Sequence, residues 1–254
     1  MTLETIHIAT GQRGIATLTL ARPEKHNAIS AQMMTEITDT CAAINNDKTI
    51  RAVVLRAQGK SFCAGGDLDW MREQFAADRS GKITQATVLS NMLNALDTLN
   101  KPLIGIVEGN AFGGGLGLMA VCDIVIAKPN LKFAFTETKL GLIPATIGPF
   151  VLRRMGETYA RQVFITAKTF DTAFAQTCGL VSITSADTDA ALETEINAVL
   201  ATQPNATSMA KDLLQTLRAT DTKTDITTSI NALADCWQGA EAQQQISAFL
   251  KGKS

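Results

Sequence analysis

Short segments between residues 5 and 135 either alternate apolar and polar residues or are apolar throughout, as β-strands are. The expected strands are Thr5–Ala9, Ile15–Leu20, Arg51–Ala57, Leu103–Val107, Asp123–Ala127 and Lys132–Phe135. The first two flank a turn that begins and ends with glycine, which predicts a hairpin. The run Leu103–Val107 has the β-branched bias of a buried strand.

Apolar residues at helical spacing follow several of these strands. One stripe comprises Met33, Ile37, Cys41 and Ile44, and Ser30 just before it is a candidate N-cap for this helix. A second stripe comprises Leu89, Met92, Leu93, Leu96 and Leu99. A polar stretch, 76–84, precedes the second stripe, and we expect it to be a mobile connection.

The order strand, strand, helix recurs along residues 1–186, which predicts an α/β core of stacked turns with short strands and outer helices. Residues 187–254 are rich in Ala, Thr and Gln, with helical periodicity and no clear strand. We expect this second part to be a helical appendage of the core.

A run of three glycines, Gly113–Gly115, opens the almost wholly apolar segment Leu116–Val121. Glycine lets the main chain approach a ligand, and the start of a helix presents free N–H groups and a positive dipole end. The turn therefore suits an anion, although a tight turn packed against the core is an equally good interpretation. Leu118 stands where the GxGxxG fingerprint needs its third glycine, and no GK[ST] follows, which disfavours both common nucleotide-binding folds.

A second glycine-bearing loop runs from Gly59 to Leu68 and again exposes main-chain N–H groups. It contains Asp67, which follows Gly65 and Gly66 directly. An aspartate beside glycines usually caps a helix or hydrogen-bonds within its own loop. We favour that interpretation of Asp67 over a catalytic role.

Composition narrows the class of protein. The chain has 254 residues, 46% of them hydrophobic, and a net charge of −1 at pH 7, so it can bury a substantial core. It has no long basic block, no apolar run of the roughly 18 residues that span a membrane, and a polar start unlike a signal peptide. We expect a soluble, cytoplasmic protein that binds neither nucleic acid nor membrane.

The supply of metal ligands is poor. The five cysteines are Cys41, Cys63, Cys122, Cys178 and Cys236. They form no CxxC pair, and we interpret them as buried thiols. Only His7 and His26 are present, so neither a zinc site nor a Ser-His-Asp triad is well supplied. We expect no metal, and carboxylates should carry any acid–base chemistry.

Four motifs in order resemble the crotonase, or enoyl-CoA hydratase/isomerase, family over residues 15–250. The motifs are ARPEKHNAIS, FCAGGDL, EGNAFGGGLGL followed by CDIVIA, and FAFTETKLGLIPA. The resemblance implies a crotonase-like spiral of ββα turns, a helical C-terminal region with oligomer contacts, and a homotrimer or dimer of trimers. It also implies an acyl-CoA thioester as substrate, with coenzyme A as part of that substrate and no separate cofactor.

The resemblance also assigns roles to individual positions. Family members donate two backbone N–H groups to the thioester oxygen, and the matching positions are Ala64 and Gly114; an enolate oxygen needs such preorganised donors. Lys25 matches a lysine that approaches coenzyme A phosphates, and Phe249 with Lys251 resembles the element that reaches the adenine, often across a subunit contact. The implied substrate and coenzyme A contacts are Lys25, Ala28, Ala64, Gly65, Gly66, Asp67, Leu68, Gly114, Phe249 and Lys251.

The catalytic positions depart from the family pattern. Two-carboxylate hydratases of this family carry one glutamate where this chain has Gly117 and another where it has Glu137. One carboxylate is therefore absent and the other retained. Desolvation in an apolar pocket would raise the pKa of Glu137, which suits a group that takes and returns a proton near neutral pH; a surface glutamate on a loop is the alternative.

Three functions follow from this pattern. The first is an enoyl-CoA hydratase, on a branched or carboxylated acyl chain, because the form GGGLGL with TETKLGLIPATIGPF looks most like bacterial methylglutaconyl-CoA-type hydratases, which share the glycine at Gly117. The second is a Δ3,Δ2-enoyl-CoA isomerase, for which Glu137 alone suffices. The third is a non-catalytic acyl-CoA-binding scaffold subunit, which would explain a lost carboxylate. Trp70 and Met71 are expected near the acyl group, but the sequence does not place them.

Overall fold

Two β-sheets carry the fold in the computed structural model, which describes residues 3–216 and 222–252. The large sheet consists, in spatial order, of β1 (Ile6–Thr10), β2 (Ile15–Leu20), β3 (Ala52–Ala57), β5 (Leu103–Val107), β7 (Ile124–Ala127) and β10 (Ile183–Thr184). The small sheet consists of β4 (Ser61–Cys63), β6 (Asn110–Phe112), β8 (Lys132–Ala134) and β9 (Phe170–Asp171). β1 and β2 form the antiparallel hairpin that the sequence predicts.

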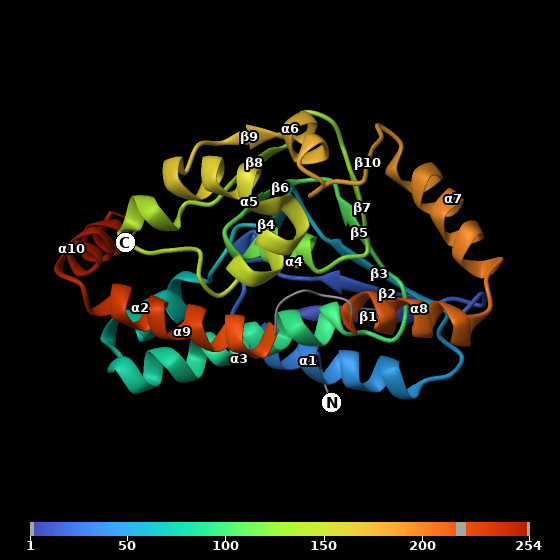
Figure 1. The fold of residues 1–254 in the computed structure, drawn as a ribbon, viewed down its shortest axis with the longest axis horizontal. Helices are drawn as coiled ribbons and strands as arrows, with labels where there is room; N and C mark the ends of the chain where they lie inside the picture. The colour runs from blue at the N-terminus through green and yellow to red at the C-terminus, as the bar shows by residue number, and fades with distance from the viewer. Residues whose placement is uncertain (1–2, 217–221, 253–254) are drawn as a thin grey trace.

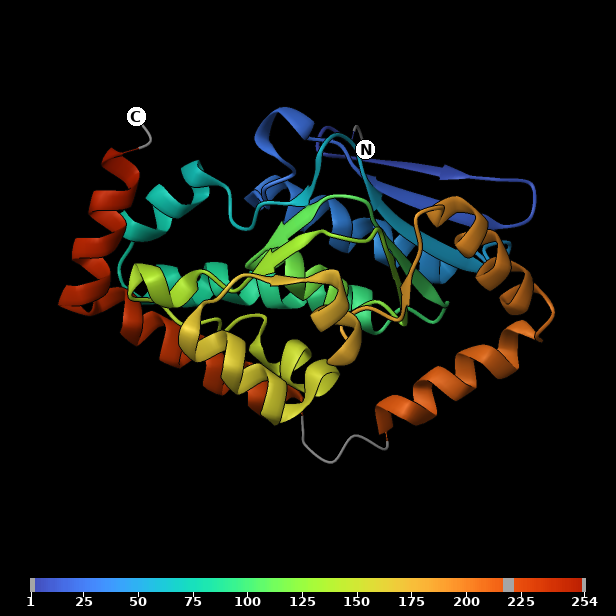
Figure 2. The same ribbon diagram turned by 90° about the horizontal axis from the view of Figure 1, so that it is seen from above.

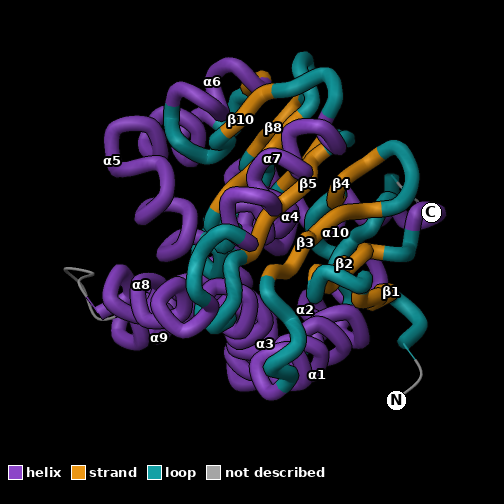
Figure 3. Tube along the Cα trace, turned by 90° about the vertical axis from the view of Figure 1, so that its right-hand side faces the viewer, coloured by secondary structure: helices purple, strands orange, loops and turns teal. Residues whose placement is uncertain are grey.

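The chain alternates between the two sheets. β3, β5 and β7 lie parallel and adjacent in the large sheet, while β4, β6 and β8 lie parallel and adjacent in the small one. Each turn therefore supplies one strand to the large sheet, the next strand to the small sheet, and then one or more helices. The expected spiral of ββα turns is confirmed, and Figure 3 shows the strands stacked in this way.

Helices cover the sheets. They are α1 (Ala31–Asn46), α2 (Leu68–Ala76), α3 (Arg79–Asp97), α4 (Gly114–Ala120), α5 (Gly148–Thr166), α6 (Thr172–Thr177), α7 (Thr188–Leu200), α8 (Pro204–Thr216), α9 (Thr222–Gln238) and α10 (Ala240–Lys251), with 3₁₀ turns η1 (Pro23–Lys25) and η2 (Glu137–Leu140). In Figure 1, α1, α3 and α9 lie below the large sheet, and α5 and α6 lie above it with β8 and β9. Figure 2 shows α10 beside α2 at one end of the molecule and α7 with α8 at the other.

The central strand β5 is buried along its whole length. Ile104 and Ile106 pack in a cluster that includes Ile196 of α7, whereas Leu103 and Val107 belong to the main core. Because both faces of the strand are covered, it reads as a continuous apolar run and not as an alternating one.

The structure corrects the sequence-based expectation for residues 76–84. We expected a mobile connection, but α2 ends at Ala76 and α3 begins at Arg79, with the Asp78 carboxylate accepting a hydrogen bond from the Gly81 N–H. A capping aspartate restarts the helix after two residues. The strands β4, β6, β9 and β10 went unpredicted because each has only two or three residues.

Cysteine burial follows the expectation where the structure describes it. Cys41, Cys63, Cys122 and Cys178 are buried free thiols, and the side chain of Cys236 lies outside the described residues. Residues 188–200, 204–216, 222–238 and 240–251 are helical, as expected for the C-terminal region. α9 packs on α3 and α10 contacts α2; the part this region plays in oligomer contacts stays a prediction.

Candidate active site

The candidate site lies where three neighbouring strands of the small sheet end. β4, β6 and β8 run parallel, so the residues that follow them meet at one edge of the sheet. The loop 64–67 follows β4, the glycine turn follows β6, and Glu137 opens η2 shortly after β8. Three motifs that are about 50 and 25 residues apart in sequence are thereby brought together by strand pairing alone.

A pocket of about 520 Å³ opens at this edge, a size typical of small-molecule sites. Its lining includes the expected positions Lys25, Ala28, Ala64, Gly65, Gly66, Asp67, Leu68, Gly114, Glu137 and Phe249. Lys25 is exposed on η1 at the rim. Lys251 is exposed at the end of α10 and lies outside the lining.

The first glycine loop presents a different N–H group from the one expected. The Ala64 N–H donates to the His26 carbonyl at 3.0 Å, so it is already used. Ile29 donates to the Gly65 carbonyl and accepts from the Asp67 N–H, which leaves the intervening Gly66 N–H without an acceptor among the described residues. The expectation that Ala64 is the donor is therefore corrected in favour of Gly66.

The second glycine turn presents Gly114. The Gly113 N–H donates to the Ala134 carbonyl, and the positive φ of 47° at Gly113 turns the chain into α4. Gly114 is the first residue of that helix, and its N–H has no acceptor among the described residues. An ideal Cβ on Gly114 would lie 2.9 Å from Ile29 Cδ1, so a side chain at this position would require the end of Ile29 to shift.

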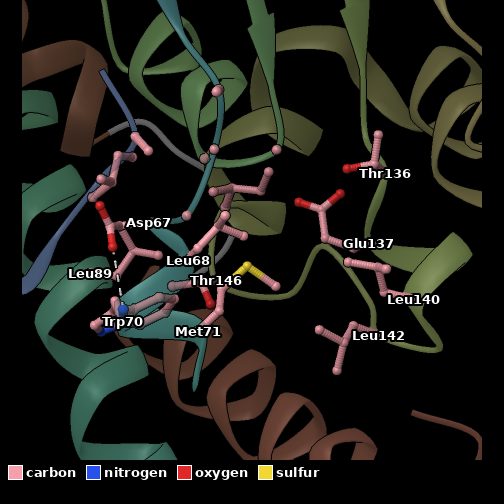
Figure 4. A pocket seen from close by; sticks show the side chains of 18 of the residues that line it. Asp67, Leu68, Trp70, Met71, Leu89, Thr136, Glu137, Leu140, Leu142 and Thr146 are labelled. Carbon is pink, nitrogen blue, oxygen red and sulfur yellow. Dashed lines mark hydrogen bonds between the residues drawn. The ribbon is translucent and has the colours of Figure 1, made fainter. Parts of the chain in front are cut away.

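Glu137 places its carboxylate beside this turn. A Cβ built on Gly113 would lie 3.1 Å from Glu137 Oε1, and Oε2 is buried with no hydrogen-bond partner among the described residues. Burial raises the pKa of Glu137 to about 7, opposed weakly by a hydrogen bond from its own backbone. Figure 4 shows Glu137 on the opposite side of the pocket from Trp70 and Met71 of α2.

The position of the missing carboxylate is filled by packing. A Cβ on Gly117 would lie 2.6 Å from Ile147 Cγ2 and 3.3 Å from Leu93 Cδ1. Ile147 itself lines the pocket. The place that a glutamate side chain would take is therefore occupied by an isoleucine.

Asp67 has the structural role that we favoured. Its Oδ1 accepts hydrogen bonds from the Asp69 and Trp70 N–H groups at the start of α2, and its Oδ2 pairs with Arg22 at 2.8 Å. Although burial alone raises the pKa of this carboxyl, Arg22 and the Asp69 N–H lower it below its ordinary value. The carboxylate is committed to holding the loop in place.

Several lining residues could not be found from the sequence. Besides Leu68, Trp70 and Met71, the inner walls consist mainly of apolar side chains from distant segments: Met34, Leu89, Leu140, Leu142, Ile147, Leu233 and Trp237. Trp237 also packs with Leu142 and lies 5.9 Å from the Lys82 ammonium group. Helical spacing indicates that such residues are buried, but it carries no sign of which ones share a cavity.

Within the described ranges, no group of three or more His, Cys, Asp or Glu side chains could hold a metal ion. A membrane-crossing helix is likewise absent from 3–216 and 222–252, since none there is both long and apolar enough. Among the groups that the pocket does present are the Glu137 carboxylate and the Gly66 and Gly114 N–H groups, which have no acceptor among the described residues.

Comparisons with known proteins agree with this arrangement. Residues 10–253 match the family described as enoyl-CoA hydratase/isomerase. A probable enoyl-CoA hydratase of Mycobacterium bovis is 34% identical, with 84% of this chain and 81% of that protein covered. The crystal structure of an enoyl-CoA hydratase from Shewanella pealeana is 33% identical, covers 98% of this chain and 94% of its own, and superposes with a TM-score of 0.83.

Fungal proteins are also similar over a shorter region. An enoyl-CoA hydratase of Alternaria alternata is 32% identical over 179 residues, which is 70% of this chain. The match spans 58% of the length of that protein.

Proposed function

The chain belongs to the enoyl-CoA hydratase/isomerase family, and we propose that it adds water across the α,β double bond of an enoyl-CoA thioester with Glu137 as its acid–base group. The family resemblance makes it an enzyme of the enoyl-CoA hydratase type. One observation carries the finer proposal: a buried carboxylate with an unpaired oxygen and a pKa of about 7 lies beside the free N–H of Gly114.

The reaction follows from these groups. Ionised Glu137 removes a proton from water as the water oxygen bonds to the β-carbon, and the π electrons move toward the thioester oxygen. The Gly66 and Gly114 N–H groups stabilise the enolate oxygen that results, and losing one such donor typically costs about 3 kcal/mol of transition-state stabilisation. Glu137 then returns the proton to the α-carbon, so that water is added and the carboxylate is regenerated.

Coenzyme A is proposed to enter along η1 and α10. Lys25 and Phe249 line the pocket from these two elements. Lys25 would meet phosphate and Phe249 the adenine, while Lys251 would act outside the pocket. In this chain α10 lies beside α2 of the same subunit, so Phe249 reaches the pocket without a second subunit.

The apolar walls support a branched acyl chain. The lysine and arginine side chains of the lining are Lys25 at the rim and Arg72, and Arg72 is paired with Asp69 at 2.7 Å. A carboxylated chain would have to compete for Arg72, so the branched apolar substrate is the better supported of the two classes.

Isomerisation is the second candidate, favoured by the apolar Ile147 where the other carboxylate would be. A single proton carrier can move a double bond without water. Incubation of straight, branched and carboxylated enoyl-CoAs in water enriched in heavy oxygen separates the reactions. Hydration puts the label on the β-carbon of the product, whereas isomerisation gives an unlabelled product with a shifted double bond, and the latter result alone would refute our proposal.

We also propose a homotrimer or a dimer of trimers. Met209 and Leu214 of α8 are each 70% exposed and Leu213 is 56% exposed, and large apolar side chains gathered on one helix are typical of an interface. Sedimentation equilibrium tests the assembly, and a monomer at micromolar concentration would contradict it.

A further inference from the structure

A water molecule that attacks from an apolar pocket needs more than one polar partner. Ordered water typically makes two to four hydrogen bonds, and Glu137 supplies one acceptor. The opposite carboxylate of two-carboxylate hydratases is replaced here by Gly117 and Ile147. If hydration is the reaction, some other group has to hold the water.

Most polar side chains of the lining are committed elsewhere. Asp67 is paired with Arg22, Asp69 with Arg72, and the Trp70 indole N–H donates to Gln85. Glu24, Lys25 and His26 are exposed on or beside η1 at the rim. The hydroxyl groups of Thr136 and Thr146 and the indole N–H of Trp237 remain, and of these only the hydroxyls can accept a hydrogen bond from water.

Thr146 has the properties that a water ligand needs. It is only 6% exposed, its side chain lines the pocket, and its hydroxyl makes no hydrogen bond to any described residue. The oxygen of this hydroxyl is not among the fully buried side-chain atoms that lack a partner in the described chain, so it is open to the pocket, and a molecule bound there can hydrogen-bond to it. Thr136 is only half-buried and precedes Glu137 directly, so it cannot hold a molecule from the opposite side.

The position of Thr146 fits the same role. It precedes Ile147, whose side chain fills the place beside Gly117, and adjacent Cα atoms are about 3.8 Å apart. Both Thr146 and Ile147 line the pocket, so they belong to the same stretch of its lining. Figure 4 shows Thr146 and Glu137 reaching the pocket from different segments.

We propose that the Thr146 hydroxyl positions the attacking water for Glu137, as a neutral replacement for the missing carboxylate. This inference rests on the proposed hydration. Thr146 accepts a hydrogen bond from one O–H of the water while the Glu137 carboxylate takes the proton of the other O–H. The threonine itself neither gains nor loses a proton over the reaction, so it acts by orientation.

The test compares Thr146→Val, which keeps the volume and removes the hydroxyl, with Thr146→Ser, which keeps the hydroxyl. We expect Thr146→Val to lower kcat for hydration about 10- to 100-fold through misplaced water, and Thr146→Ser to restore most of it. The Kd for a saturated acyl-CoA and the Tm should stay near the wild-type values, because neither depends on the water. Thr136→Val is measured in parallel.

The outcomes separate the two proposals. Wild-type protein that hydrates no enoyl-CoA overturns both the hydratase assignment and the role of Thr146. A wild type that hydrates, with Thr146→Val equally fast, overturns the role of Thr146 alone, as does a loss seen only in Thr136→Val. Equal losses in the valine and serine variants would indicate a packing defect and also overturn it. A crystal structure with a saturated acyl-CoA should show a water between Thr146 Oγ1 and the Glu137 carboxylate.

Discussion

Two walls of the same pocket are built in opposite ways. The wall after β8 holds Glu137, a buried carboxylate with an unpaired oxygen. The wall formed by α4 holds Gly117, against which Ile147 and Leu93 pack so closely that no Cβ fits without movement. Both positions carry glutamate in two-carboxylate hydratases of the family that the motifs resemble.

The difference shows how a site can lose a charged group without leaving a hole. An empty space beside Gly117 would lose packing interactions, since cavities in a core cost free energy. Ile147 fills that space and makes this wall apolar. Because no second carboxylate stands there, charge repulsion does not add to the pKa of Glu137. In the proposed mechanism all proton transfer is then left to Glu137, whose pKa of about 7 arises from burial.

The largest expected effect comes from removing the one carboxylate. Glu137→Gln should lower kcat about 10²- to 10⁴-fold, the usual contribution of a general acid–base group, with acyl-CoA affinity within a few-fold of wild type because the shape is kept. Single-turnover kinetics and calorimetric titration with a saturated acyl-CoA measure the two quantities. A variant that retains more than about a tenth of wild-type turnover would move the chemistry elsewhere.

Restoring the other carboxylate should damage the packed wall. Gly117→Glu forces its Cβ within 2.6 Å of Ile147 Cγ2, and overpacking of this kind costs about 1–3 kcal/mol of stability. We expect a lower midpoint in urea and a loss of activity on branched substrates. The double variant Gly117→Glu/Ile147→Ala should recover stability, and any gain in rate should appear with short straight enoyl-CoAs. A single variant as stable as wild type would contradict the packing argument.

The pH dependence should show a single ionisation on the acid side. Only ionised Glu137 can accept the proton of water, so kcat/KM should fall as the pH drops below about 7. The measurement is kcat/KM for hydration as a function of pH. The affinity for a saturated acyl-CoA, measured over the same pH range, is the control for changes in binding. A hydratase rate that is constant from pH 6 to pH 8, or one that has two acid-side ionisations, would be at odds with one buried carboxylate near pH 7.

The smallest effect is on stability. The folded-state pKa of Glu137 is about 7 against an ordinary value of 4.5, so between these pH values the folded protein binds more protons than the unfolded chain. Stability therefore falls as the pH rises through this window. Glu137→Gln lacks this titration. The Tm of the variant minus the Tm of the wild type should therefore increase by a few degrees between about pH 4.5 and about pH 7. A difference in Tm that does not change with pH would mean that the carboxyl is solvated.

Much of the site could be predicted from local sequence. The glycine triplet, the loop around Gly65 and Gly66, and a glutamate between apolar segments all mark the places where the chain forms the pocket. The helix-capping role of Asp67 was also predictable, because a cap depends only on residues close in sequence. The strands of the large sheet other than β10 were predictable for the same reason, since each has its own apolar pattern.

Which N–H groups are free was decided by tertiary structure. Ala64 and Gly66 both lie in the glycine loop. The Ala64 N–H donates to the His26 carbonyl, whereas Ile29 bonds to the residues on either side of Gly66 and leaves the Gly66 N–H free among the described residues. Hydrogen bonds between segments almost 40 residues apart leave no local pattern.

The sequence by itself determined the apolar periodicity, the glycine turns and the single retained glutamate, because each is a property of neighbouring residues. Tertiary structure decided that Ile147 fills the place beside Gly117, that Trp237 of α9 closes the pocket, and that Glu137 is desolvated. Those features depend on which surfaces meet when distant elements pack, and a cavity is defined only by the elements that surround it.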